Sequence, residues 1–92
     1  MQKYEMMVIY DTEEKSLQET KDFVKETFSA NSIKVLEEKE WGNRELAYLI
    51  NKRKRGFYTL FNFEAPENSI VEINKAFGLY KGIMRNLVIK RD

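Results

Sequence analysis

Hydrophobic positions recur along this chain with two periods, and each change of period marks a boundary between predicted elements. Apolar residues alternate with polar ones in four segments, as in β-strands. They recur every three or four residues in two others, as in amphipathic helices. The predicted order is a strand over Met1–Tyr10, a helix ending near Ala30, strands over Ile33–Ile50 and Phe57–Ala65, a helix opening at Pro66 and a strand over Gly82–Lys90. This β-α-β-β-α-β order predicts an α+β ferredoxin-like sandwich, a four-stranded antiparallel sheet with both helices on one face.

Several strands are predicted to carry apolar residues on both faces. In the first strand, one face holds Tyr4, Met6, Val8 and Tyr10, and the other holds Glu5, Met7 and Ile9. In the third strand, Phe57, Thr59, Phe61 and Phe63 share a face; in the last, Met84, Asn86 and Val88 are expected opposite Ile83, Arg85, Leu87 and Ile89. Two partly apolar faces predict that the first strand lies in the centre of the sheet.

Each helix carries a start signal and one apolar stripe. Ser16 followed by Glu19 fits a capping box at the start of the first helix. Pro66 fits the start of the second, with Asn68 and Ser69 beside the cap. The predicted stripes are Leu17, Thr20, Phe23, Val24, Thr27 and Phe28 in the first helix, and Ile70, Ile73, Ala76, Phe77 and Tyr80 in the second. Spacings of three and four place each stripe on one helix face.

The second and third strands predict a long hairpin with a basic tip. Gly42-Asn43 interrupts the alternation of the second strand and is predicted to be a bulge. Asn51–Gly56 is predicted to be the turn, and it holds four consecutive cations: Lys52, Arg53, Lys54 and Arg55. Such a tip attracts phosphate; the alternative is a tip that is basic only for solubility.

Size and composition indicate one soluble domain. The 92 residues, 42% of them apolar, are enough for one core and too few for two, so residues 1–92 are expected to form a single domain. The absence of cysteine excludes disulfides and thiolate metal sites. The N-terminal residues lack the layout of a signal peptide, and no apolar run approaches the roughly 20 residues of a membrane helix. We therefore expect a cytoplasmic protein.

The net charge of +1 conceals an uneven distribution. Residues 1–40 carry six Lys and Arg against ten Asp and Glu, a net of −4, whereas residues 41–92 carry ten against five, a net of +5. This asymmetry allows a local basic patch on a nearly neutral protein; the alternative is ordinary solvated charge.

The residues needed for catalysis are missing. The chain has no histidine or cysteine, and its four glycines match no phosphate-binding loop. Glu37, Glu38 and Glu40 are expected to be a solvated strand edge, since ionised carboxylates are rarely buried unpaired. Acylphosphatases share this architecture but need an Arg-bearing phosphate loop after the first strand, where this chain has the acidic Asp11–Glu14. We therefore expect no enzyme and no metal site.

A sandwich with both helices on one side leaves the other sheet face open, and here that face is predicted to be apolar. Met7, Ile9, Tyr58 and Leu60 indicate a partner surface, unless long side chains such as Arg85 cover them. RNA-recognition motifs share the strand order and use aromatics on this face. Arg55–Phe61 matches their third-strand signature only loosely, since the second glycine is absent.

The hairpin sequence resembles a known family. Trp41–Lys52 is similar to the Trp-Gly-x-Arg-x-Leu-Ala-Tyr-Pro-Ile-x-Lys segment of bacterial small-subunit ribosomal protein six. Tyr4-Glu5, Glu64-Ala65-Pro66 and Met84–Ile89 fit the same family at its usual spacing, so the resemblance covers the whole chain. Leu49 departs from it, standing where the family usually has Pro, and the sequence ends at Arg91-Asp92 without the charged tail of many members.

The resemblance implies a ferredoxin-like structural constituent of the small ribosomal subunit that acts in the cytoplasm and supports assembly and translation. It implies binding to the central domain of small-subunit rRNA in a heterodimer with small-subunit ribosomal protein eighteen, with no cofactor, membrane or small-molecule substrate. The candidate rRNA-binding residues are Lys3, Arg44, Lys52, Arg53, Lys54, Arg55, Arg85, Lys90 and Arg91. The candidate partner-surface residues are Met7, Ile9, Trp41, Tyr48, Tyr58 and Leu60. Trp41 is expected to be either a core residue or an interface anchor.

A second hypothesis is a stand-alone regulatory or small-molecule module on the same fold, dimeric through its sheet. It would require a ligand pocket, and the sequence offers no glycine-rich or convergent polar motif for one.

Overall fold

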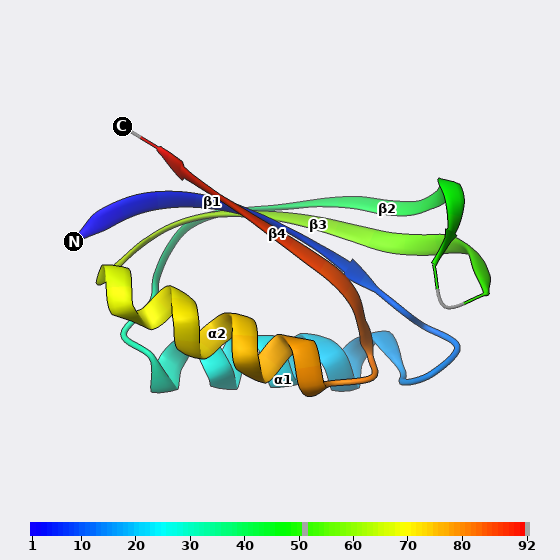
Figure 1. Cartoon of the computed structure of the whole chain (residues 1–92), viewed down its shortest axis with the longest axis horizontal. Helices are drawn as coiled ribbons and strands as arrows, with labels where there is room; N and C mark the ends of the chain where they lie inside the picture. The colour runs from blue at the N-terminus through cyan, green and yellow to red at the C-terminus, as the bar shows by residue number, and fades with distance from the viewer. Residues whose placement is uncertain (51, 92) are drawn as a thin grey trace.

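The computed structural model describes residues 1–50 and 52–91 and contains the six predicted elements in the predicted order. They are β1 (Gln2–Tyr10), α1 (Leu17–Ala30), β2 (Lys34–Ile50), β3 (Arg53–Ala65), α2 (Glu67–Leu79) and β4 (Ile83–Arg91). The strands form an antiparallel sheet in the order β2-β3-β1-β4, and both helices lie on the same side of it (Figure 1). The ferredoxin-like prediction and the central position of β1 are confirmed.

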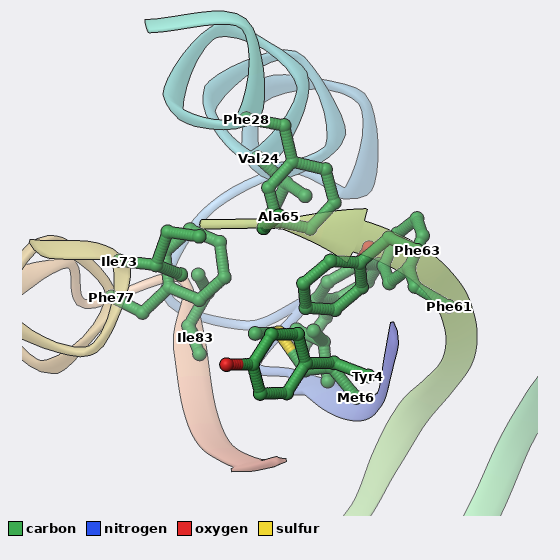
Figure 2. Packing of buried hydrophobic residues seen from close by; sticks show 12 residues of the cluster. Tyr4, Met6, Val24, Phe28, Phe61, Phe63, Ala65, Ile73, Phe77 and Ile83 are labelled. Atoms are coloured by element: carbon green, nitrogen blue, oxygen red, sulfur yellow. The ribbon is translucent and has the colours of Figure 1, made fainter. Parts of the chain in front are cut away.

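The core lies between the sheet and the two helices (Figure 2). The predicted inward face of β1 is buried there, with Met6 and Val8 fully enclosed. Phe28 of α1 meets Phe61 of β3 edge-on at 5.2 Å between ring centroids, and it meets Phe77 of α2 at 5.9 Å. The helical stripes are therefore the surfaces that cover the sheet.

The two helices begin differently, one with a side-chain cap and one without. The Oγ of Ser16 accepts a hydrogen bond from the backbone N–H of Glu19 at 3.1 Å, so the predicted N-cap of α1 is confirmed. The N-cap of α2 is Pro66 itself, without a side-chain hydrogen bond. Ser69 is instead buried on the inner side of that helix.

The predicted bulge in β2 occurs one residue earlier than expected. Pairing with β3 shifts between Glu40 and Gly42, so Trp41 is the extra residue. Gly42 has φ +81°, a left-handed conformation that glycine adopts readily. The bulge therefore interrupts the side-chain alternation of β2 at Trp41.

The predicted turn over Asn51–Gly56 is wrong in its extent. Asn51 lies outside the described residues, but β3 already begins at Arg53, so Arg53 to Gly56 are strand residues. Lys52, with φ +65°, is in the turn. The connection is tighter than predicted because extra chain length is taken up within β2, where pairing with β3 shifts between Glu45 and Ile50.

The predicted faces of β4 are wrong at Ile83 and Met84, which lie on the opposite sides of the sheet from those predicted relative to Arg85, Leu87 and Ile89. Tyr10 pairs with Ile83 and Ile9 pairs with Arg85, which leaves Met84 as a bulged residue. Ile83 therefore joins the core, while Met84 packs against Ile9 on the opposite face of the sheet. A bulge breaks the side-chain alternation, so the residues before it change sides relative to those after it, and the sequence pattern does not reveal it.

Candidate functional site

The end of β2 leaves the plane of the hairpin and bends over the face of the sheet that the helices leave open (Figure 1). We call residues 46–49 the β2 arch. Leu46 is buried against Ile9 and Met84, and this small cluster also contacts Met7 and Tyr58. The arch is therefore held over the central strands by apolar packing.

Gly56 of β3 makes room for this arrangement. A Cβ atom at Gly56 would lie 2.5 Å from Cγ2 of Ile9 and 3.7 Å from Cδ2 of Leu46. A distance under 3 Å is a steric clash, so only glycine fits without movement of Ile9.

A polar contact fixes the far end of the arch. Nη1 of Arg85 donates a hydrogen bond of 2.7 Å to the hydroxyl of Tyr48, and the guanidinium carbon lies 5.8 Å from the centre of the same ring. Arg85 and Tyr48 thus join the arch to β4.

Beside the arch lies a hollow with a cavity volume of about 570 Å³, which we call the open-face groove. Its walls are mainly apolar, and they include Leu87 and Ile89 of β4, which are 54% and 60% exposed. The groove is lined by Glu5, Met7, Ile9, Trp41, Leu46, Ala47, Tyr48, Ile50, Tyr58, Leu60, Arg85, Leu87 and Ile89. The structure therefore brings together all six residues that the sequence nominated for a partner surface.

Trp41 lies at the rim of this groove and is 45% exposed, so the core alternative for it is excluded. The guanidinium carbon of Arg44 is 5.6 Å from the centre of the indole ring. The pair forms a cationic and aromatic surface on β2, an edge strand of the sheet.

The nine candidate RNA-binding residues do not form one patch. Lys3, Lys90 and Arg91 lie at the end of the sheet where the N- and C-terminal strands meet, since Lys3 pairs with Arg91 and Tyr4 with Lys90. Arg44, Lys52, Arg53, Lys54 and Arg55 lie at the hairpin tip, at the other end (Figure 1). Arg85 lies between them in the groove.

The guanidinium of Arg53 is already paired with carboxylates. Its Nε donates to both carboxylate oxygens of Asp11 at 3.2 and 3.3 Å, and Glu13 and Glu14 each lie 3.5 Å away. Asp11 is only 4% exposed. The hydrogen bond to Asp11 raises the pKa of Arg53 further above its ordinary value. Arg53 therefore ties the hairpin to the β1–α1 loop.

The other tip cations are more available. Lys52, Lys54 and Arg55 are exposed, although Nε of Arg55 donates a 2.8 Å hydrogen bond to the side chain of Asn43. At the opposite end, Arg91 forms a 3.0 Å ion pair with Glu5. Lys52 and Lys54 are thus the tip cations best placed to meet an external anion.

The acidic segment of β2 has no catalytic geometry. Glu37, Glu38 and Glu40 are all exposed. Glu40 pairs with Lys21, and Glu37 accepts a 3.0 Å hydrogen bond from Asn62. The expected solvated edge is confirmed. In residues 1–50 and 52–91, no cluster of acidic side chains suits a metal ion, and no helix is long and apolar enough to span a membrane.

The groove lining also includes Leu46, Leu87 and Ile89, which were not among the predicted partner-surface residues, and Met84 packs with Leu46 and Ile9 without lining the groove. The signal for Leu87 and Ile89 was present, since both were assigned to the face opposite Val88. Leu46 and Met84 carried no such signal because both depend on shifts of strand register.

Comparison with known proteins identifies the family. The family model for ribosomal protein S6 matches residues 3–90. The chain belongs to the ribosomal protein S6 family. The small ribosomal subunit protein bS6 of Fusobacterium nucleatum subsp. nucleatum is 33% identical over 94 residues, with both chains fully covered. The bS6 of Symbiobacterium thermophilum is 34% identical, covering 98% of this chain and 97% of its own length. The expectations of a small-subunit ribosomal protein, cytoplasmic and not an enzyme, are confirmed at the level of the S6 family.

Solved structures agree on the fold. The 30S ribosomal protein S6 of Thermotoga maritima superposes with a TM-score of 0.86 at 22% identity, covering 98% of this chain and 87% of that one. The C-terminal domain of the MgtC protein from Mycobacterium tuberculosis also matches, with a TM-score of 0.66 at 12% identity over 99% of this chain and 88% of that one. Because a protein of another name shares the architecture, membership of the S6 family rests on sequence and not on fold.

Proposed function

We propose that this chain binds the central domain of small-subunit rRNA as a heterodimer with small-subunit ribosomal protein eighteen. In this proposal the open-face groove receives the protein partner, and the exposed cations of the hairpin tip contact RNA phosphates. Its role is assembly and structure.

The groove carries the first half of the proposal. Exposed apolar surface that is contiguous and hollowed marks partner sites on soluble proteins. Leu87, Ile89 and Tyr48 are each more than half exposed and border one cavity. The arch and its contact with Arg85 hold this surface in one shape before any partner arrives, which lowers the entropic cost of binding.

The hairpin tip supports the second half. Lys52 in the turn and Lys54 on β3 are exposed at the tip of a hairpin anchored by Arg53, so their charges are carried on a positioned element. Phosphate contacts of this kind orient a protein on RNA without reading sequence. The net charge of +1 is small for a protein that would hold RNA alone, which favours a binding surface completed by a partner.

Co-sedimentation with small ribosomal subunits tests the groove. Leu87→Glu with Ile89→Glu places two charges on the groove wall, and we expect this variant to be lost from the subunit fraction. Leu79→Glu is the matched control, since Leu79 is 87% exposed on α2, away from the groove. Equal incorporation of both variants would refute the groove as the partner site.

A further inference from the structure

We propose that Trp41 and Arg44 form a stacking site for one unpaired RNA base, a refinement that rests on the proposed function. Sequence reasoning assigned Trp41 to the protein partner. Three observations favour RNA as the ligand of Trp41: the neighbouring Arg44, the local charge, and the position of the ring on the edge strand.

Arg44 is the first argument. Its guanidinium lies against the indole ring at 5.6 Å, and Arg44 is itself exposed. Within residues 1–50 and 52–91 it forms no ion pair with a carboxylate, unlike Arg53 and Arg91. A protein surface that buried Trp41 would also desolvate this cation, which is unfavourable unless an anion meets it. A nucleotide supplies a flat base for the ring and a phosphate for the cation.

The local charge is the second argument. Between Trp41 and Tyr58 the sequence holds five cations and one acid, Glu45. Arg44 pairs with Gly56 on the adjacent strand, so Trp41 belongs to the same strand pair as the tip lysines. An RNA strand that meets Lys52 and Lys54 through its phosphates is therefore near the indole ring.

The bulge supplies the third argument. Trp41 is the extra residue between Glu40 and Gly42, and it is on the edge strand of the sheet. In RNA-recognition motifs the stacking aromatics lie on the central strands. Here Phe57 and Phe61 of β3 pack with the core, and the open side of β1 carries Met7 and Ile9. The exposed ring of Trp41 thus lies at the rim of the sheet and not at its centre. The floor of the open-face groove remains available to the protein partner.

Fluorescence of the single tryptophan tests this directly, because all indole emission comes from Trp41. The full chain is titrated at low salt with single-stranded octaadenylate, with an RNA duplex of equal length, and with the partner protein alone. Stacking tolerates any base, so octaadenylate is a suitable probe. We expect the single strand to quench the emission and the duplex to leave it nearly unchanged. A response to the partner protein alone, without one to the single strand, would assign the ring to the protein interface and overturn the proposal.

Affinity measurements on variants complete the test. Trp41→Ala should weaken binding of octaadenylate about 5- to 150-fold, the range expected for one stacked base, and Trp41→Phe should restore most of it. Leu49→Ala, on the same strand and 60% exposed, is the control and should bind as the parent does. RNA binding that is indifferent to Trp41→Ala would overturn the stacking site and leave the proposed function standing. Failure of the parent chain to bind central-domain RNA even with its partner would overturn both.

Discussion

Single residues in this protein have roles that follow from contacts distant in sequence. Arg53 and Asp11 are 42 positions apart, yet their ion pair joins the hairpin to the β1–α1 loop. A run of four cations indicates a basic tip, but it does not indicate which cation is already neutralised. Which cation is neutralised depends on the length and register of the hairpin, and the run of charges does not give these.

Arg53→Ala should destabilise the protein, whereas Lys54→Ala should not. The substitution leaves the buried carboxylate of Asp11 with only its backbone hydrogen bonds from Glu13 and Glu14. Arg53 is partly exposed, so we expect a moderate loss in the free energy of unfolding that exceeds the effect of Lys54→Ala, measured by urea denaturation. Lys54→Ala should stay within about 0.5 kcal/mol. Equal effects of the two would show that the Arg53 network is not structural.

Gly56→Ala should loosen the arch. The new methyl group would meet Ile9, whose side chain is enclosed by Leu46 and Met84. Overpacking of this kind costs about 1–3 kcal/mol, so we expect a lower unfolding midpoint and weaker binding of the protein partner. Gly78→Ala is the control, because nothing lies within 4 Å of a Cβ there and it should be neutral or stabilising.

Tyr10 is expected to lower the stability of the protein at high pH. The side chain is 1% exposed, and burial, the largest cause, raises the pKa of its hydroxyl to about 12 from 10.0. Because the folded pKa lies above the unfolded one, the stabilisation is complete below pH 10 and is lost as pH rises from 10 to 12. Stability in urea should fall by up to about 3 kcal/mol over that window. Tyr10→Phe should remove most of this fall, and an unchanged alkaline profile would show that Tyr10 is not its source.

The sequence was most informative about the secondary-structure elements. Four alternating segments and two helical stripes predicted every strand and helix in the described residues, because burial against one core imposes those periods. The arch could not be predicted in this way. Leu46, Tyr48 and Ile50 continue the alternation of β2, so the pattern looks like an uninterrupted strand although its pairing with β3 shifts there.

Charge reversal at the hairpin tip tests the role of that element. Lys52→Glu with Lys54→Glu leaves Arg53 and its carboxylates in place, so the fold should persist. With the partner present, we expect weaker binding to central-domain RNA and a salt slope lower by roughly two, one for each phosphate that the variant no longer neutralises. Lys75→Glu on α2 is the control. An unchanged slope in the double variant would show that the tip is merely solvated.

At the scale of the whole molecule, the fold and the family were accessible from sequence, whereas the layout of the surface was not. The six residues nominated for a partner do line one groove, but the nine nominated cations are divided between two ends of the sheet. The sequence shows only that the two groups of cations are separated along the chain. The strand pairing shows that they lie at opposite ends of the sheet. The division favours one RNA surface at the hairpin tip and a separate role for Lys3, Lys90 and Arg91.

Shared binding is the central claim, and one measurement tests it most directly. The dissociation constant of central-domain rRNA is measured for this chain alone and for the chain with small-subunit ribosomal protein eighteen, at the same salt concentration. Coupling between two binding partners commonly changes affinity about 5- to 150-fold, and we predict tighter binding by this chain within that range when the partner is present. Equal affinity with and without the partner would contradict the account.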